Sequence, residues 1–138
     1  MATIKRFEDI EAWKKARAFS KGVWKATQKG TFARDYKLKD QINDSSGSIM
    51  HNIAEGFGRG GRAEFISFLT IAKGSADEAK SQLYSALDRE HIDETTFTGL
   101  YELADETGRM INGLMEYLNK TDVRGLKWKD RSLTKGEA

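Results

Sequence analysis

Five cations follow one another near the start of the chain at the spacing of a single helix face. They stand at i, i+3, i+7, i+11 and i+15, and they are Lys14, Arg17, Lys21, Lys25 and Lys29. Clustered cations bind a nucleic-acid backbone because neutralising its phosphates releases condensed counterions. The row therefore predicts a phosphate-binding surface. Two alternatives stay open: a solvated helix face, and a contact with an acidic face of another subunit.

Glycines and arginines crowd the segment 56–62, directly after the second apolar stretch. They are Gly56, Gly58, Arg59, Gly60, Gly61 and Arg62. Bare glycine backbone and the start of the next helix are able to approach a phosphate, with both arginines beside it. The phosphate-loop pattern Gly-x-x-x-x-Gly-Lys-Ser/Thr is absent, so a plain helix-to-helix turn competes with phosphate binding. We include Arg59 and Arg62 in the predicted nucleic-acid surface.

Residues that suit metal binding or catalysis form no recognisable set. His51 and Glu55 lie at i, i+4, but no second pair supports a metal site, and the Glu-x-x-His motifs of di-iron bundles are missing. There is no Gly-x-Ser-x-Gly nucleophile turn, and the two histidines are far apart and belong to no catalytic motif. We therefore expect no metal, no cofactor and no enzymatic activity.

Apolar residues recur with a helical period along almost the whole chain. The pattern predicts helices at 9–29, from 35 to the glycines at 56–61, at 62–90 and at 93–120, with Asp9, Asp35 and Asp93 as caps. Because the connections are short, neighbours should be antiparallel. The fold class predicted for residues 1–120 is all-α, an antiparallel up-and-down four-helix bundle. Residues 121–138 carry a net charge of +2 and no sustained apolar stripe, which predicts a flexible basic tail.

The same pattern predicts which side chains are buried. The expected core includes Ile49, Ile53, Phe68, Leu69, Ala72, Leu83, Leu100 and Ile111. Small residues on the second and third helices should let these helices pack closely, and they are Gly47, Ser48, Ala72, Gly74, Ser75, Ala76 and Ala79. Asn52 and Glu55 are expected to satisfy hydrogen bonds at a helix end or to contact a ligand. Trp13 and Trp24 are interpreted as core or interface anchors, and Trp128 as the better base-stacking candidate.

Composition limits the remaining classes of protein. The 138 residues include no cysteine, which excludes disulfides and thiolate metal sites. No apolar run approaches the length of a transmembrane helix, and the first residues lack the apolar centre of a secretory signal. We expect a cytoplasmic, bacterial-type protein without a membrane partner.

Four segments together resemble one bacterial protein family. The most characteristic is Asn-Ile-Ala-Glu-Gly at 52–56, which includes Asn52, Glu55 and Gly56, and the others lie at 7–13, 38–42 and 65–75, the last containing Gly74 and Ser75. Their order and spacing over about residues 7–118 resemble the small four-helix bundle proteins encoded in intervening sequences of large-subunit ribosomal RNA genes. Many members carry arginine in the second helix, where this chain has Asn-Asp-Ser-Ser at 43–46.

The resemblance also implies partners. The family is similar to the accessory protein of diversity-generating retroelements, a barrel-shaped homopentamer that binds nucleic acid and a reverse transcriptase. Residues 5–29 carry a net charge of +5 and residues 91–120 a net charge of −4, which favours contacts between subunits. The leading hypothesis is a non-enzymatic, homopentameric protein that binds the backbone of RNA or DNA. The alternative is an oligomeric scaffold for a protein partner such as a reverse transcriptase.

Overall fold

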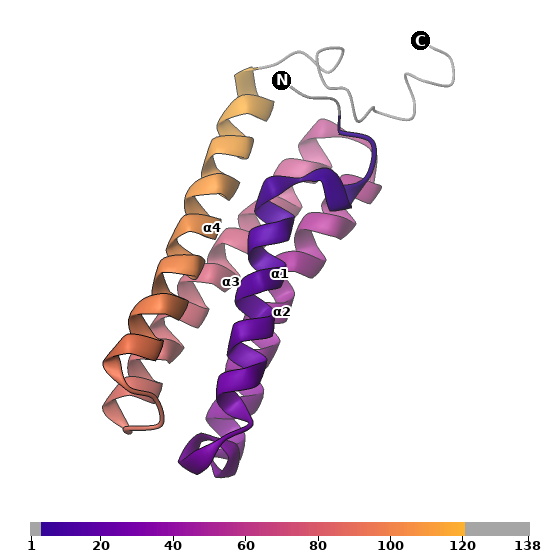
Figure 1. Cartoon of the computed structure of the whole chain (residues 1–138). Coiled ribbons are helices and arrows are strands. Elements are labelled where there is room, and N and C mark those ends of the chain that lie inside the picture. The colour runs from indigo at the N-terminus through magenta and orange to yellow at the C-terminus, as the bar shows by residue number, and fades with distance from the viewer. Residues whose placement is uncertain (1–3, 121–138) are drawn as a thin grey trace.

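Four long helices form an antiparallel up-and-down bundle in the computed structural model, which describes residues 4–120 (Figure 1). They are α1 (Glu11–Thr27), α2 (Tyr36–Gly58), α3 (Arg62–Asp88) and α4 (Glu94–Lys120), and the short 3-10 helices η1 (Phe7–Asp9) and η2 (Gly30–Arg34) precede α1 and α2. No strand occurs between residues 4 and 120. The predicted fold class is confirmed, and the predicted tail at 121–138 lies outside the described residues.

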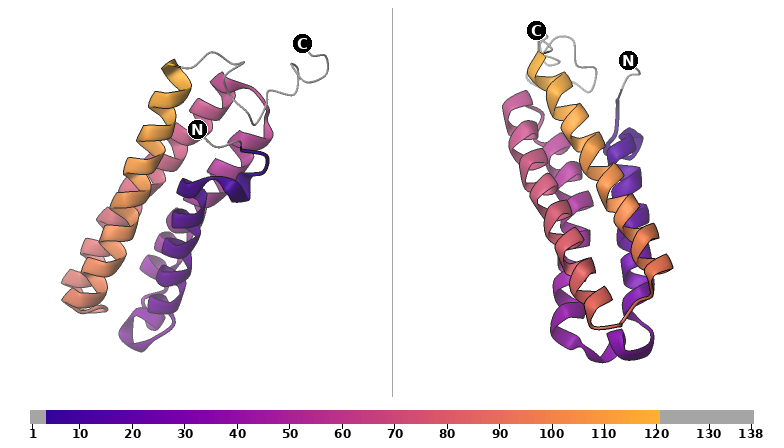
Figure 2. Two further views of the ribbon diagram at one scale, coloured as in Figure 1. Left: turned by 45° about the horizontal axis from the view of Figure 1, so that its top comes forward. Right: turned by 90° about the vertical axis from the view of Figure 1, so that its left-hand side faces the viewer.

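Each helix packs against two others, so the four helices enclose one core. α1 contacts α2 and α4, α3 contacts α2 and α4, and the most extensive contact joins α2 to α3. The α1–α2 and α3–α4 connections lie at one end of the bundle, and the α2–α3 turn and the start of α1 lie at the other (Figure 2). The outer side of α1 is therefore left facing solvent along the length of the bundle.

Two of the three predicted N-terminal caps are present at the starts of their helices. The Asp35 carboxylate accepts a hydrogen bond from the Leu38 N–H at 3.4 Å, and the Asp93 carboxylate accepts one from the Thr96 N–H at 2.8 Å. Asp9 was predicted to cap the first helix, and this is wrong. It belongs to η1 and accepts from the backbone of Arg6, while the extended and buried Ile10 precedes α1.

The first helix is also shorter than predicted, because it ends at Thr27 and not at Lys29. Thr27 is fully buried, and its hydroxyl donates to the carbonyl of Trp24 at 2.9 Å. The same hydroxyl accepts a hydrogen bond from the Asn43 side chain at 3.0 Å, which ties this end of α1 to α2. Gly30 then takes a positive φ of 57° and begins η2, a conformation that glycine adopts without strain.

Seven of the eight residues predicted to form the core are buried, and Phe68 is the exception. Ile49, Ile53, Leu69, Ala72, Leu83, Leu100 and Ile111 all lie in the core cluster. Phe68 is half-buried, because it lies at the edge of the α2–α3 contact with its ring beneath the Arg59 guanidinium, 5.1 Å from the ring centroid. Its phenyl ring covers Gly56 instead of filling the centre of the bundle.

Small residues do bring α2 and α3 together, as predicted. Ala72, Ala76 and Ala79 are fully buried, and a Cβ at Gly56 would lie only 2.6 Å from the Phe68 Cβ. Gly74 does not take part, because it is exposed and a Cβ there would meet nothing within 4 Å. Close packing therefore depends on the alanines of α3 and on Gly56, and the prediction for Gly74 is wrong.

Candidate nucleic-acid interface

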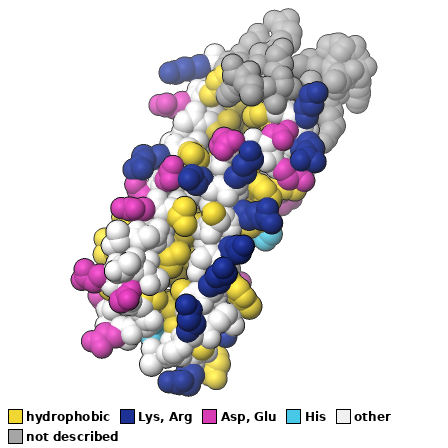
Figure 3. Space-filling model, in the orientation of Figure 1, with side chains coloured by type: hydrophobic (Ala, Val, Ile, Leu, Met, Phe, Trp, Pro, Cys, Tyr) yellow, Lys and Arg dark blue, Asp and Glu magenta, His cyan; other side chains and the backbone are white. Residues whose placement is uncertain are grey.

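The predicted row of cations lies on the outer side of α1. The buried residues of α1 repeat with a helical period, so the cations between them are carried to the opposite face, where Lys14, Arg17, Lys21 and Lys25 are all exposed. Lysine and arginine side chains form a visible line along the bundle in Figure 3. Lys29 is exposed as well, but it follows the end of α1 and precedes η2. We call Lys14, Arg17, Lys21, Lys25 and Lys29 the basic row.

Most of the basic row has no acidic partner within the bundle. Lys14 pairs with Glu11 at 3.1 Å. Within residues 4–120, no carboxylate lies within ion-pairing distance of Arg17, Lys21, Lys25 or Lys29. These positive charges are therefore exposed and uncompensated along α1 and just beyond its end, which suits them to bind an external anion.

The two tryptophans of α1 differ in their surroundings. Trp13 is half-buried, with its ring 5.1 Å from that of Phe7 and the Arg17 guanidinium 5.8 Å from its centroid. Trp24 is 56% exposed. The interpretation of Trp24 as a core anchor is therefore wrong for the single chain, because its position on α1 lies beside the cations and outside the apolar face.

Arg59 and Arg62 both have partners within the bundle. The Arg59 guanidinium pairs with Glu55 at 3.0 Å and lies over the Phe68 ring. Arg62 donates to the Leu118 carbonyl at 3.1 Å and so joins the start of α3 to the end of α4. The structure thus gives each arginine a structural task at the α2–α3 turn, and their contact with nucleic acid stays a prediction.

The Asn52 region forms a polar contact between α2 and α3. The Asn52 amide donates to the Ser48 carbonyl at 2.8 Å and to the Ser48 hydroxyl at 2.9 Å, and that hydroxyl lies 2.9 Å from the hydroxyl of Ser75. Glu55 is exposed and pairs with Arg59. Within the chain, Asn52 and Ser75 thus fix the register of the two helices, and Gly56 allows them to approach.

Potential metal ligands do not gather in the part of the chain that the structure describes. His51 and Glu55 are both exposed on α2. No group of three or more His, Cys, Asp or Glu side chains is placed to hold a metal ion among residues 4–120. No helix in this range is both long and apolar enough to cross a bilayer.

A charged cluster that the sequence did not predict joins the two connections at one end of the bundle. His91 Nε2 lies 2.8 Å from an Asp35 carboxylate oxygen, and the Arg89 guanidinium pairs with the same oxygen at 2.8 Å. The hydrogen bonds from His91 and Arg89 lower the pKa of Asp35 to about 2. His91 also lies 2.8 Å from the Thr31 hydroxyl and stacks on Phe32. The cluster fixes η2 against the α3–α4 turn.

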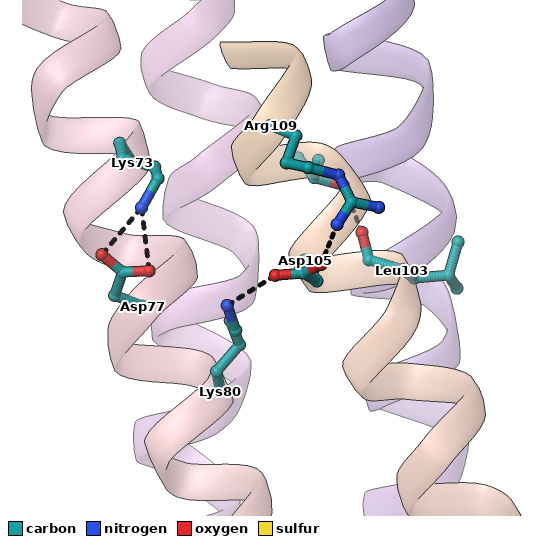
Figure 4. A network of polar contacts seen from close by, with 7 residues as sticks. Lys73, Asp77, Lys80, Leu103, Asp105 and Arg109 are labelled. Carbon is teal, nitrogen blue, oxygen red and sulfur yellow. Dashed lines mark hydrogen bonds and ion pairs between the residues drawn. The ribbon is translucent and has the colours of Figure 1, made fainter. Parts of the chain in front are cut away.

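Three cations on the α3–α4 side are paired, unlike most of the basic row. Lys73 bonds Asp77 at 2.9 Å, Lys80 bonds Asp105 at 2.9 Å, and Arg109 bonds the same Asp105 (Figure 4). The Lys80 hydrogen bond lowers the pKa of Asp105, and Asp105 raises that of Lys80. These positive charges are neutralised locally and are poorly suited to hold an external phosphate.

The fold and these contacts define a small all-helical bundle protein with one open basic side and a polar contact between α2 and α3. The family model described as 23S rRNA-intervening sequence protein matches residues 8–113, and the chain belongs to that family. This confirms the family resemblance of the sequence. The further relation to the accessory protein of diversity-generating retroelements stays a prediction.

A solved structure of another protein shows the same fold. It is a protein with unknown function from the S23 ribosomal protein family of Bacteroides thetaiotaomicron. The two chains are 22% identical and superpose with a TM-score of 0.69, over 75% of this chain and 97% of that one. Among the curated proteins, none matches this chain.

Proposed function

We propose that the chain is a non-enzymatic nucleic-acid-binding protein that contacts the backbone of RNA or DNA through the basic row. The observation that carries the proposal is the absence of acidic partners for Arg17, Lys21 and Lys25 within the described residues. A cation already paired with a carboxylate must break that pair to bind phosphate. An unpaired, exposed lysine such as Lys21 or Lys25 has only water and counterions to displace.

The arrangement of charge favours recognition of backbone over base sequence. Lysines on an exposed helix face are point charges on flexible stems, and they match the regular negative charge of a phosphate chain. The bundle has none of the modules that read base edges, so affinity should vary little with sequence. The family name, which refers to ribosomal RNA, is compatible with RNA as the ligand.

We further propose that binding involves a homo-oligomer, with the pentamer of the family resemblance as the expected form. This part of the proposal rests on the family resemblance, because the net positive charge of residues 5–29 comes from the basic row, which the proposal assigns to the nucleic acid. A closed ring would repeat the basic row around its axis. Several weak contacts on one strand then raise the apparent affinity without any new type of contact.

The test replaces three lysines of the basic row, as K14Q/K21Q/K25Q. We expect weaker binding to every RNA and DNA sequence tried, because a shared backbone contact is lost. Fluorescence anisotropy with labelled oligonucleotides measures the affinity at low and moderate salt. Light scattering on the same samples measures the oligomeric state.

A matched variant controls for net charge. K73Q/K80Q/R109Q removes the same number of cations from the α3–α4 side, where each cation is paired. We expect it to bind as the wild type does. Equal affinity of the wild type and K14Q/K21Q/K25Q would contradict the proposal. Dissociation of the K14Q/K21Q/K25Q oligomer would show that these lysines join subunits, and would favour the scaffold hypothesis.

A further inference from the structure

Trp24 is a large aromatic side chain left open to solvent beside the cations of the basic row. We propose that it stacks on an unpaired base, so that this side of α1 binds single-stranded nucleic acid in preference to a duplex. This inference rests on the proposed function and adds the class of ligand. It assigns Trp24 a role in binding, and not in the core.

The position of Trp24 on α1 puts it in contact range of the same strand as the lysines. It follows Arg17 by seven residues and Lys21 by three, so it lies on their face of α1, about 4.5 Å along the helix axis from Lys21 and one residue before Lys25. A phosphate bound between these lysines would leave the attached base within reach of the indole ring. Positive charge and an aromatic face are the two parts that single-strand binding surfaces combine.

The other aromatic rings are less available. Trp13 lies against Phe7, and Tyr84, although 50% exposed, packs against Phe97 at 4.8 Å and Tyr101 at 5.7 Å. Trp24 has no ring contact with another described residue. It is therefore the tryptophan of the described chain that offers a free face next to unpaired cations.

The ligand class follows from what a ring of this kind is able to contact. In a duplex, each base is covered above and below by its neighbours, and an indole ring on a helix surface reaches only the backbone. In a single strand the base faces are open, and every base has one, so stacking is tolerant of sequence. Stacking on Trp24 thus agrees with the weak sequence dependence expected of the lysines.

The experiment compares Trp24→Ala with the wild type on two probes, a labelled oligouridylate and an RNA duplex of equal length. We expect Trp24→Ala to lose about 5- to 100-fold in affinity for oligouridylate, the usual effect of removing one stacking ring, and to bind the duplex as before. Trp24→Phe keeps a ring and should retain most of the affinity. Tyr84→Ala removes an exposed ring on the α3–α4 side and should change neither affinity.

The outcomes separate this inference from the proposed function. If Trp24→Ala binds both probes as the wild type does, the stacking role is overturned and the lysine surface stands. If it loses affinity for both probes equally and dissociates in light scattering, Trp24 is a subunit contact and the inference is again overturned. If the wild type binds neither probe, the proposed function itself fails.

Discussion

The outer side of α1 and the α3–α4 side both present cations, and they differ in what surrounds those cations. Lys73, Lys80 and Arg109 each bond a carboxylate on their own helix or the next one. Lys21 and Lys25 have no such partner within the described residues. The number of lysines and arginines therefore says little about where a phosphate binds. The number of lysines and arginines that have no acidic partner is the more informative quantity for locating a phosphate-binding surface.

The difference between the two sides exists only while the hydrophobic core holds each helix face in place. Removing core atoms should therefore have the largest effect of the variants considered. Ile53 on α2 is fully buried, so Ile53→Ala should lower the free energy of unfolding by about 2–5 kcal/mol. Urea denaturation followed by circular dichroism measures it. Ile71 is 51% exposed, and Ile71→Ala should stay within about 0.5 kcal/mol of the wild type. Similar midpoints for the two variants would contradict the assignment of the α2 inner face.

Two glycines in the segments that resemble the family, Gly56 and Gly74, differ in how much space surrounds them. A Cβ at Gly56 would lie 2.6 Å from the Phe68 Cβ, so Gly56→Ala should cost about 1–3 kcal/mol through overpacking. Gly74 has open space around it inside α3, so Gly74→Ala should stabilise the protein by up to about 1 kcal/mol. Thermal unfolding measures both changes. A loss of stability at Gly74 would indicate a contact that the single chain does not contain, such as a subunit interface.

The stability that the paired charges contribute should also depend on pH. The pKa of Asp35 is lowered to about 2 in the folded chain, so its stabilising pairs with His91 and Arg89 are fully present above about pH 4. This stability is lost as the pH falls through about 2, because the carboxylate becomes protonated. Asp35→Asn should lower the melting temperature at pH 6 and converge on the wild type near pH 2. An unchanged difference between the two proteins at both pH values would contradict the role of the cluster.

The sequence predicted the elements well because local signals determine them. Apolar residues at helical spacing identified all four helices, and Asp35 and Asp93 were identified as caps from their place before the apolar stripes. The end of α1 was missed, since it depends on a hydrogen bond from Asn43 to Thr27 across two helices. Phe68 was placed in the core because periodicity identifies a face and does not tell its centre from its edge.

The candidate site was only partly predictable, because part of it depends on contacts between helices and not on local sequence. The cations of α1 follow directly from their spacing, and the structure gives their exposure. Whether a cation has a partner depends on contacts between distant segments, such as Lys80 with Asp105 or His91 with Asp35, which are 25 and 56 residues apart. The exposure of Trp24 likewise depends on how α1 is turned against α2 and α4. No signal in the local sequence distinguishes it from Trp13.

The salt dependence of binding tests the central claim most directly. For single-stranded RNA, each phosphate contact contributes about 0.7 to the slope of log affinity against log salt concentration. K14Q/K21Q/K25Q removes the unpaired Lys21 and Lys25 together with Lys14, which is paired with Glu11, so it should flatten the wild-type slope by at least about 1.4, whereas K73Q/K80Q/R109Q should leave it unchanged. Equal slopes for the two triple variants would contradict the claim that the unpaired cations of α1 form the nucleic-acid-binding surface.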